Sequence, residues 1–263
     1  MGQGAQPESA PGKDMERDMK ATLFATMAVA VTGSALAQPI DSLQVNERIF
    51  NDFPNSNLTI TNDFPNSFVV DERDFGAGGF ANRHMAFFSQ DGGNNAADFD
   101  YGDGFDYAVT LNLNATPADG REAGFATDLF GFGFFGVLGN GEIAAFGSFL
   151  PFHSFGTVYT NGTDVDLRMI YRPGAGENQL PASTMEYIID LGSGPVSSGE
   201  IAFDNTEGGI PTNFFAKIGV SVQNQGSAGG SSTATFTNFV VPAPGTGLLA
   251  LAGVFAGTRR RRA

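Results

Sequence analysis

An alternation of apolar and polar residues with a period of two is the sequence feature that most restricts how this chain can fold. Between residues 105 and 113 every second side chain is large and apolar: Phe105, Tyr107, Val109, Leu111 and Leu113. This pattern is typical of a strand that buries one face. The same period, or a shorter apolar run, occurs at residues 68–70, 85–89, 142–146, 165–171, 186–191, 200–203, 214–222 and 233–237. The sequence therefore predicts roughly nine strands.

Turn signals separate these segments, and no convincing amphipathic helix lies between them. Asp91-Gly92-Gly93 and Asn140-Gly141 are examples of the turn signals. Parallel sheets need long crossover connections, which are usually helices, so their absence favours antiparallel sheets. We predict an all-β domain over residues 38–240, an antiparallel β-sandwich of the jelly-roll type. The order of its strands is similar to that of concanavalin A-like and lectin-like sandwiches.

Composition and charge exclude several classes of protein. The 263 residues include 36 glycines and no cysteine, and the formal net charge is −14. Without cysteine there is no disulfide, zinc-thiolate site or cysteine nucleophile. An acidic chain repels phosphate backbones, so we expect no nucleic-acid partner.

The N-terminal region has the pattern of a secretory signal. Residues 1–18 are polar and are interpreted as an over-extended leader, with the true start at Met15 or Met19. Residues 19–37 combine one basic residue, an apolar run and the small residues Ala35 and Ala37, which predicts a signal helix cleaved after Ala37. The alternative is a short buried helix. A signal peptide implies passage through the general secretory machinery.

The C-terminal region, residues 241–263, has three parts in a fixed order. Val241-Pro242-Ala243-Pro244-Gly245 is followed by 13 residues, mostly apolar or small, and then by Arg259, Arg260, Arg261 and Arg262. The middle part would span about 20 Å as a helix, less than the hydrocarbon core of a bilayer. This tripartite tail resembles the PEP-CTERM sorting signal, although Ala243 stands where that family often has Glu. The resemblance implies transient membrane anchoring, processing by an exosortase-type membrane protease, and a place in the cell envelope or outside the cell. A weak permanent anchor is the alternative.

Two local patterns lie inside the predicted domain. Asn51-Asp52-Phe53-Pro54-Asn55-Ser56 recurs as residues 62–67, which we interpret as two similar turns flanking one short strand, with a surface recognition element as the alternative. Residues 124–141 are rich in phenylalanine and glycine. We expect them to lie in the sandwich interior or at a tight bend of a sheet.

A loop of residues 91–106 carries most of the chemistry that the sequence offers. It holds five aspartates and two asparagines, and oxygen-rich loops of this kind bind calcium. Asp98, Asp100, Asp103 and Asp106 are the predicted ligands. Because the spacing does not match the EF-hand pattern, a solvated acidic turn is the alternative.

The sequence contains no catalytic motif. The two histidines, His84 and His153, are interpreted as structural or surface residues, and there is no nucleophile elbow or paired-histidine metal motif. Asp164 with Asp166, and Glu186 with Asp190, are acidic pairs of a kind that an acidic protein produces by chance. We therefore predict an exported, non-enzymatic protein of the cell envelope or extracellular matrix, without a certain cofactor. The first alternative is a calcium-assisted carbohydrate-binding module that contacts extracellular polysaccharide, and the second is a polysaccharide hydrolase.

Overall fold

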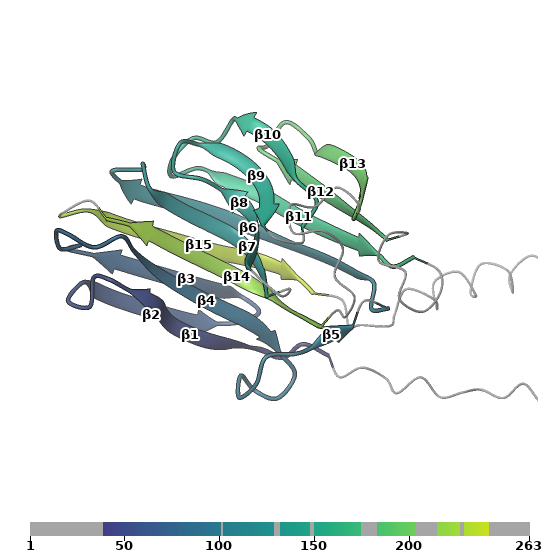
Figure 1. Cartoon of the computed structure of the whole chain (residues 1–263), viewed down its shortest axis with the longest axis horizontal. Coiled ribbons are helices and arrows are strands. Elements are labelled where there is room, and N and C mark those ends of the chain that lie inside the picture. Colours follow the sequence, from purple (N-terminus) through teal and green to yellow (C-terminus); the bar gives the residue numbers. More distant parts are fainter. Residues whose placement is uncertain are drawn as a thin grey trace, which may run out of the picture. The chain divides into compact units, whose positions relative to one another are not determined.

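The computed structural model describes residues 39–100, 102–128, 132–147, 150–174, 183–203, 215–226 and 229–241. These residues form two antiparallel sheets and no helix (Figure 1). The strand axes of the two sheets are roughly aligned, as in aligned sandwiches. The predicted all-β sandwich is confirmed, and its assignment to the jelly-roll type stays a prediction.

The first sheet, called sheet A, has eight strands. Their order is β1 (Ser42–Asn51), β4 (Ala81–Ser89), β14 (Phe215–Gln225), β7 (Arg121–Asp128), β8 (Phe132–Val137), β9 (Glu142–Gly147) and β10 (His153–Thr157), and β5 (Phe99–Asp100) pairs with β14.

The second sheet, sheet B, has seven strands. Their order is β13 (Val196–Ala202), β12 (Thr184–Asp190), β11 (Asp164–Arg172), β6 (Phe105–Thr116), β15 (Ser231–Val240), β3 (Ser67–Arg73) and β2 (Asn57–Asp63). The last two strands of the described residues, β14 and β15, therefore lie inside sheets A and B between strands from earlier in the chain. The described residues form fifteen strands. Nine were predicted from the alternation and β2 as the short strand between the two hexapeptides, whereas β1, β5, β7, β8 and β10 were not predicted because they have no clear period-two pattern.

The main core lies between the two sheets and is filled by alternate residues of their strands. In sheet B, Leu111 and Leu167 are fully buried, and in sheet A so are Phe88 and Phe125. The alternation that predicted β6 holds over its whole length, since its burial pattern changes at every residue up to Thr116.

The segment rich in phenylalanine and glycine forms the β7–β8 hairpin, and the prediction that it lies in the sandwich interior is confirmed for Phe125 and Phe135. Phe125 and Phe135 are fully buried. Gly124 and Gly136 face each other across the two strands, and a Cβ added at Gly124 would lie 2.3 Å from the carbonyl oxygen of Phe135. Glycine is needed here because the two backbones approach too closely for any side chain.

The repeated hexapeptide forms two turns at the two ends of β2, as predicted. The turn at Phe53–Ser56 precedes β2, and Phe53 is buried with 3% of its surface exposed. The turn at Phe64–Asn66 connects β2 to β3, and the half-buried ring of Phe64 packs on Phe88 and Phe239. The same hexapeptide thus forms a turn at both sites, but its phenylalanine is buried in the first turn and half-buried in the second.

The predicted signal peptide and nearly all of the predicted sorting signal lie outside the described residues, and Val241 is the last residue described. Within the residues that the structure describes, no helix is long and apolar enough to cross a membrane.

Candidate functional site

A groove of about 490 Å³ lies on the face of sheet A that is turned away from sheet B. The face follows from the alternation in β4: Ala86 and Phe88 belong to the main core, whereas Met85 and Phe87 belong to a separate cluster with Ala126. The volume is in the range of small-molecule sites. The residues that line the groove are Gln44, Asn46, Ile49, Arg83, Met85, Phe87, Thr127, Asp128 and Lys217.

The groove carries basic side chains in a strongly acidic domain. Residues 39–241 contain seven basic residues. Four of them form ion pairs with carboxylates and one, Arg121, is fully buried. Arg83 and Lys217 both line the groove, together with one acidic residue, Asp128. The groove is therefore less acidic than the protein as a whole.

A row of polar side chains crosses the sheet at the Arg83 end of the groove. The strand register places Phe50, Arg83, Gln223 and Glu122 side by side on β1, β4, β14 and β7. Arg83 donates a hydrogen bond to Gln223, which donates to Glu122 over 3.2 Å. The Arg83 guanidinium also lies 4.9 Å from the centre of the Phe50 ring, at a cation–π distance.

Burial changes the pKa of both charged groups in this row. It lowers the pKa of Arg83, while the nearby Glu122 raises it. It also raises the pKa of Glu122, against the opposing effect of Arg83. The row thus contains the planar cation of Arg83 and the partly buried carboxyl group of Glu122, and the Gln223 amide hydrogen-bonds to both. Phe50, 45% exposed, forms an apolar surface beside them.

A second polar cluster lies inside the sandwich, behind the same part of sheet A. Glu72 of β3 is fully buried and accepts four hydrogen bonds. Ser56 and Asn82 donate to Oε1 over 2.6 Å each, and Asn224 donates to Oε2 over 2.8 Å. The fourth partner is His84 Nε2, 2.8 Å from Oε2.

These contacts decide the charge of Glu72. Burial alone would raise its pKa, but the hydrogen bonds that it accepts, among them those from His84, Ser56 and Asn82, lower the pKa to about 2. Glu72 is therefore an anion inside the protein. The interpretation of His84 as a structural residue is confirmed, since only 1% of it is exposed.

Arg48 closes this cluster from the side of β1. The residue sits in a bulge of β1, between Asn46 and Phe50, with a positive φ of 51°. Its guanidinium donates to the carbonyl oxygens of Phe53 and Ser56 over 3.0 and 2.6 Å and lies 3.9 Å from Glu72 Oε1. Its backbone N–H donates to His84 Nδ1 over 3.3 Å. The bulge is thus tied to the buried cluster by both side chain and backbone.

Arg121 adds a further buried cation at this end of the sandwich. Its guanidinium lies 4.4 Å from the centre of the Phe75 ring, and its three nitrogens have no hydrogen-bond partner among the residues that the structure describes. Burial lowers the pKa of Arg121, whereas Glu72 raises it. Neither Glu72 nor Arg121 was identified as a site residue from the sequence.

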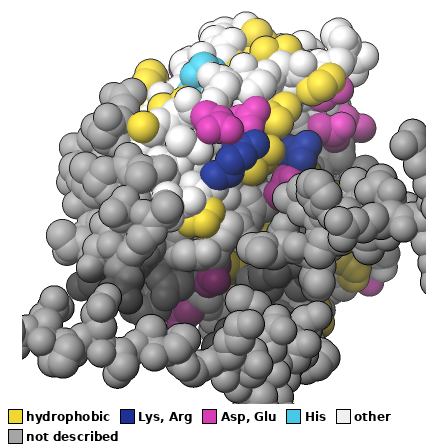
Figure 2. Space-filling model, turned by 90° about the vertical axis from the view of Figure 1, so that its right-hand side faces the viewer, with side chains coloured by type: hydrophobic (Ala, Val, Ile, Leu, Met, Phe, Trp, Pro, Cys, Tyr) yellow, Lys and Arg dark blue, Asp and Glu magenta, His cyan; other side chains and the backbone are white. Residues whose placement is uncertain are grey.

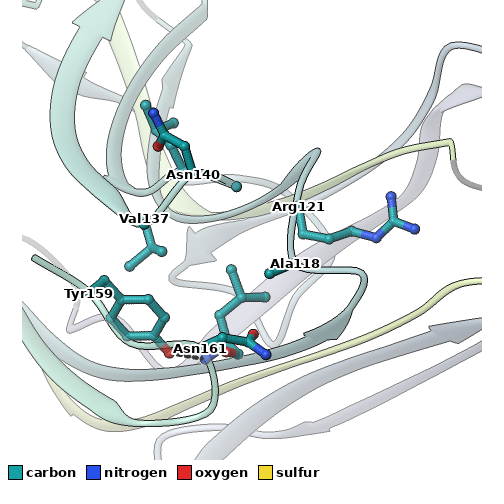
Figure 3. Close-up of a pocket in the computed structure, with 10 residues that line it drawn as sticks. Ala118, Arg121, Val137, Asn140, Tyr159 and Asn161 are labelled. Atoms are coloured by element: carbon teal, nitrogen blue, oxygen red, sulfur yellow. Dashed lines mark hydrogen bonds between the residues drawn. The ribbon is translucent and has the colours of Figure 1, made fainter. Parts of the chain in front are cut away.

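A smaller pocket of about 150 Å³ lies among the loops that follow β6 and β8 (Figure 3). Tyr159 and Asn161 line it, but their polar groups bond to the backbone of β6, at Leu113 and Ala115. The Arg121 side chain points away from the pocket. These residues fix loops, and we assign the pocket no chemistry.

The predicted calcium ligands do not converge among the described residues. Asp98 precedes β5 and is exposed, and Asp106 on β6 forms an ion pair with Arg168. Asp103 lies between β5 and β6, and the side chain of Asp100 is outside the described part of the chain. No group of three acidic or histidine side chains in the described ranges is arranged to hold a metal ion. The calcium site stays a prediction.

Other surface charges are arranged in mixed pairs. On the side of the molecule shown in Figure 2, basic side chains lie directly against acidic ones. Sheet B contains such pairs, including Arg168 with Asp106 and Arg172 with Glu186. Among the sites described, the groove on sheet A therefore has the more specific combination of charge, amide and aromatic groups.

Comparisons with known proteins give only distant structural matches. No protein-family model matches the sequence, and no curated protein matches it. Three similar solved structures are a family 7 alginate lyase in complex with substrate, the PL-14 alginate lyase from Aplysia kurodai, and the lectin UEA-II complexed with galactose. Their identities to this chain are 12%, 8% and 11%, and their TM-scores are 0.45, 0.45 and 0.36. The matches cover 70%, 79% and 76% of this chain and 81%, 100% and 96% of the other chains. At these values the similarity carries no argument about function.

Proposed function

We propose that this protein is an exported cell-envelope protein whose β-sandwich binds glycans, without catalysis, in the groove on sheet A. The observation that carries the proposal is the row of Arg83, Gln223 and Glu122 beside Phe50, at the end of a groove with an apolar floor of Met85 and Phe87.

The chemistry of a sugar ring fits this combination. Hydroxyl groups around the ring edge accept and donate hydrogen bonds, and the ring faces are lined by C–H groups that pack on apolar side chains. A planar guanidinium beside an amide can bond neighbouring hydroxyl groups. Phe50 offers the apolar surface, and its contact with Arg83 holds the two groups together.

The groove is long enough for several sugar units. Arg83 pairs with Gln223, and Lys217 is six residues before Gln223 on β14. At about 3.3 Å per residue, the two basic ends lie about 20 Å apart along the strands. Each cation has a carboxylate near it, Glu122 at the Arg83 end and Asp128 opposite Lys217, so both neutral and acidic glycans are candidates.

The arrangement of carboxylates supports a binding role over hydrolysis. Glycosidases place two carboxyl groups roughly 5 to 10 Å apart. Glu122 and Asp128 are the acidic residues of β7 on this face, and they are separated by six residues, about 20 Å along a strand.

Export is proposed from the two ends of the sequence. The signal peptide would direct the chain to the general secretory machinery, and the PEP-CTERM-like tail would anchor it transiently before an exosortase-type protease acts. Mass spectrometry of the mature protein tests this: we expect an N-terminus at Gln38, and a product that retains residues 21–31 would contradict it.

A glycan array followed by calorimetry tests the binding. The purified protein is applied to neutral and uronic-acid glycans, with and without a calcium chelator. We expect binding that Arg83→Met weakens at least tenfold and Arg73→Met leaves unchanged. Arg73 is a matched control because it lies 60% exposed on sheet B, paired with Asp71. Binding that Arg83→Met does not affect would exclude the groove, and binding abolished by the chelator would favour the calcium-assisted alternative.

A further inference from the structure

The bulge in β1 joins the buried cluster to the groove. One part of the bulge, the backbone N–H of Arg48, bonds to His84 inside the sandwich. The next two residues lie at the groove on the outer face of sheet A: Ile49 lines it, and Phe50 packs on Arg83. A change at His84 therefore has a short path to the groove wall.

The hydrogen bonds define the protonation of His84. Because Nδ1 accepts the N–H of Arg48, this nitrogen carries no proton, and Nε2 must be the atom that donates to Glu72. His84 is thus the neutral Nε2–H tautomer. A second proton could only be added at Nδ1, where it would turn an acceptor into a donor that faces another N–H group.

We infer that His84 is a positioning residue for the groove, and that its protonation at Nδ1 releases the Arg48 bulge and displaces the Ile49–Phe50 wall. This inference rests on the proposed function for its consequence, a glycan affinity that falls on acidification. The switch itself is a property of the bulge.

The surrounding charges set the balance of this switch. Among the described residues, the charged groups around His84 are Glu72 from β3 and Arg48 from β1, with Arg121 from β7 acting through Glu72. From β14, the register partner of His84 is Val222, and Asn224 is uncharged.

The bulge is a suitable element to move. A non-glycine residue with φ of 51° is held in a sparsely populated conformation, so it depends on its surrounding bonds. After loss of the bond to His84, the guanidinium contacts of Arg48 and the strand pairing at Asn46 and Phe50 remain. Bulges that redirect side chains next to binding sites are a recurrent device in sheets.

Nuclear magnetic resonance on the full-length labelled protein tests the inference without a glycan. The imidazole nitrogen shifts of His84 and the hydrogen exchange of the Arg48 amide are followed from pH 8 to pH 5. We expect the Arg48 amide to lose at least tenfold protection as His84 gains its second proton, after correction for intrinsic exchange. Protected amides between Ser42 and Asn46 serve as the internal reference and should not change.

Two variants separate the roles of the ring nitrogens. His84→Asn keeps an acceptor near Nδ1 but cannot titrate, so the Arg48 amide should stay protected at every pH. His84→Gln keeps a donor to Glu72 but has no acceptor for Arg48, so this amide should exchange rapidly at every pH.

Three results would overturn the inference: a His84 that does not titrate in this range, an Arg48 amide that stays protected while His84 titrates, or His84→Asn with the pH dependence of the wild type. Failure of glycan binding alone would refute the proposed function and leave the switch intact.

Discussion

Replacing Glu72 by glutamine tests the central electrostatic claim about the interior. The carboxylate accepts four hydrogen bonds in a site with no exposed surface. Glutamine has nearly the same shape but carries no charge, and its amide group would face donors with another donor. Removing one member of a buried charged pair costs about 3 to 5 kcal/mol. We expect the free energy of unfolding at pH 7 to fall by that amount.

The dependence on pH is the sharper part of this prediction. The pKa of Glu72 falls from 4.5 in the unfolded chain to about 2 in the folded protein. At about 1.4 kcal/mol per pH unit, this difference corresponds to about 3 kcal/mol. Because the folded pKa is the lower one, the stabilisation is complete above pH 4.5 and is lost as the pH falls toward 2. The difference between wild type and Glu72→Gln should therefore shrink by about 3 kcal/mol between pH 6 and pH 2.

Urea unfolding followed by far-ultraviolet circular dichroism at several pH values measures both effects. Asp71→Asn is the matched control, because Asp71 is the preceding residue on β3 and forms a partly exposed pair with Arg73, which should contribute less than about 1 kcal/mol. If Glu72→Gln does not fold, Ser56→Ala removes one donor to Oε1 and should cost about 1 kcal/mol, with a smaller change of the same sign. A difference between Glu72→Gln and wild type that is independent of pH would refute the reasoning.

Three further predictions concern packing and the acidic loop. Gly124→Ala should destabilise the protein by more than about 2 kcal/mol in urea unfolding because its Cβ would meet a backbone oxygen at 2.3 Å, whereas Gly76→Ala, with open space around it, should change stability by less than about 0.5 kcal/mol. Phe53→Ala should cost about 3 to 5 kcal/mol and Phe64→Ala clearly less, since Phe53 is buried and Phe64 half-buried in otherwise identical hexapeptides; equal losses would contradict the assigned burial. The predicted calcium site is tested with millimolar calcium: a rise in the melting temperature of the wild type that Asp98→Asn lacks would support the site, and no heat in calorimetry would exclude it.

The fold class could be predicted from the sequence because, in a β-sandwich, alternate residues of each strand face the core. This holds for β6, where Phe105 to Leu113 alternate and are buried at every second position. The alternation did not predict β7 and β8, because their glycines lack side chains and because neighbouring residues on both faces of the hairpin, such as Phe134 and Phe135, are buried. Arg83 and Gln223 were not predicted as a pair because 140 residues separate them, and only the register of β4 with β14 brings them together.

The buried cluster around Glu72 could not be predicted from the pattern of any single strand. On β3, Phe68 and Val70 lead by steps of two to Glu72, and on β14, Val220 and Val222 lead to Asn224. Each row is apolar until a polar residue ends it, so continuing the alternation past Val70 would have placed Glu72 on the core face. The alternation within one strand cannot predict that Glu72 and Asn224 lie next to each other, because β3 and β14 belong to different sheets. A buried carboxylate needs partners within hydrogen-bond distance, and three of the four partners of Glu72, namely Asn82, His84 and Asn224, come from the opposite sheet.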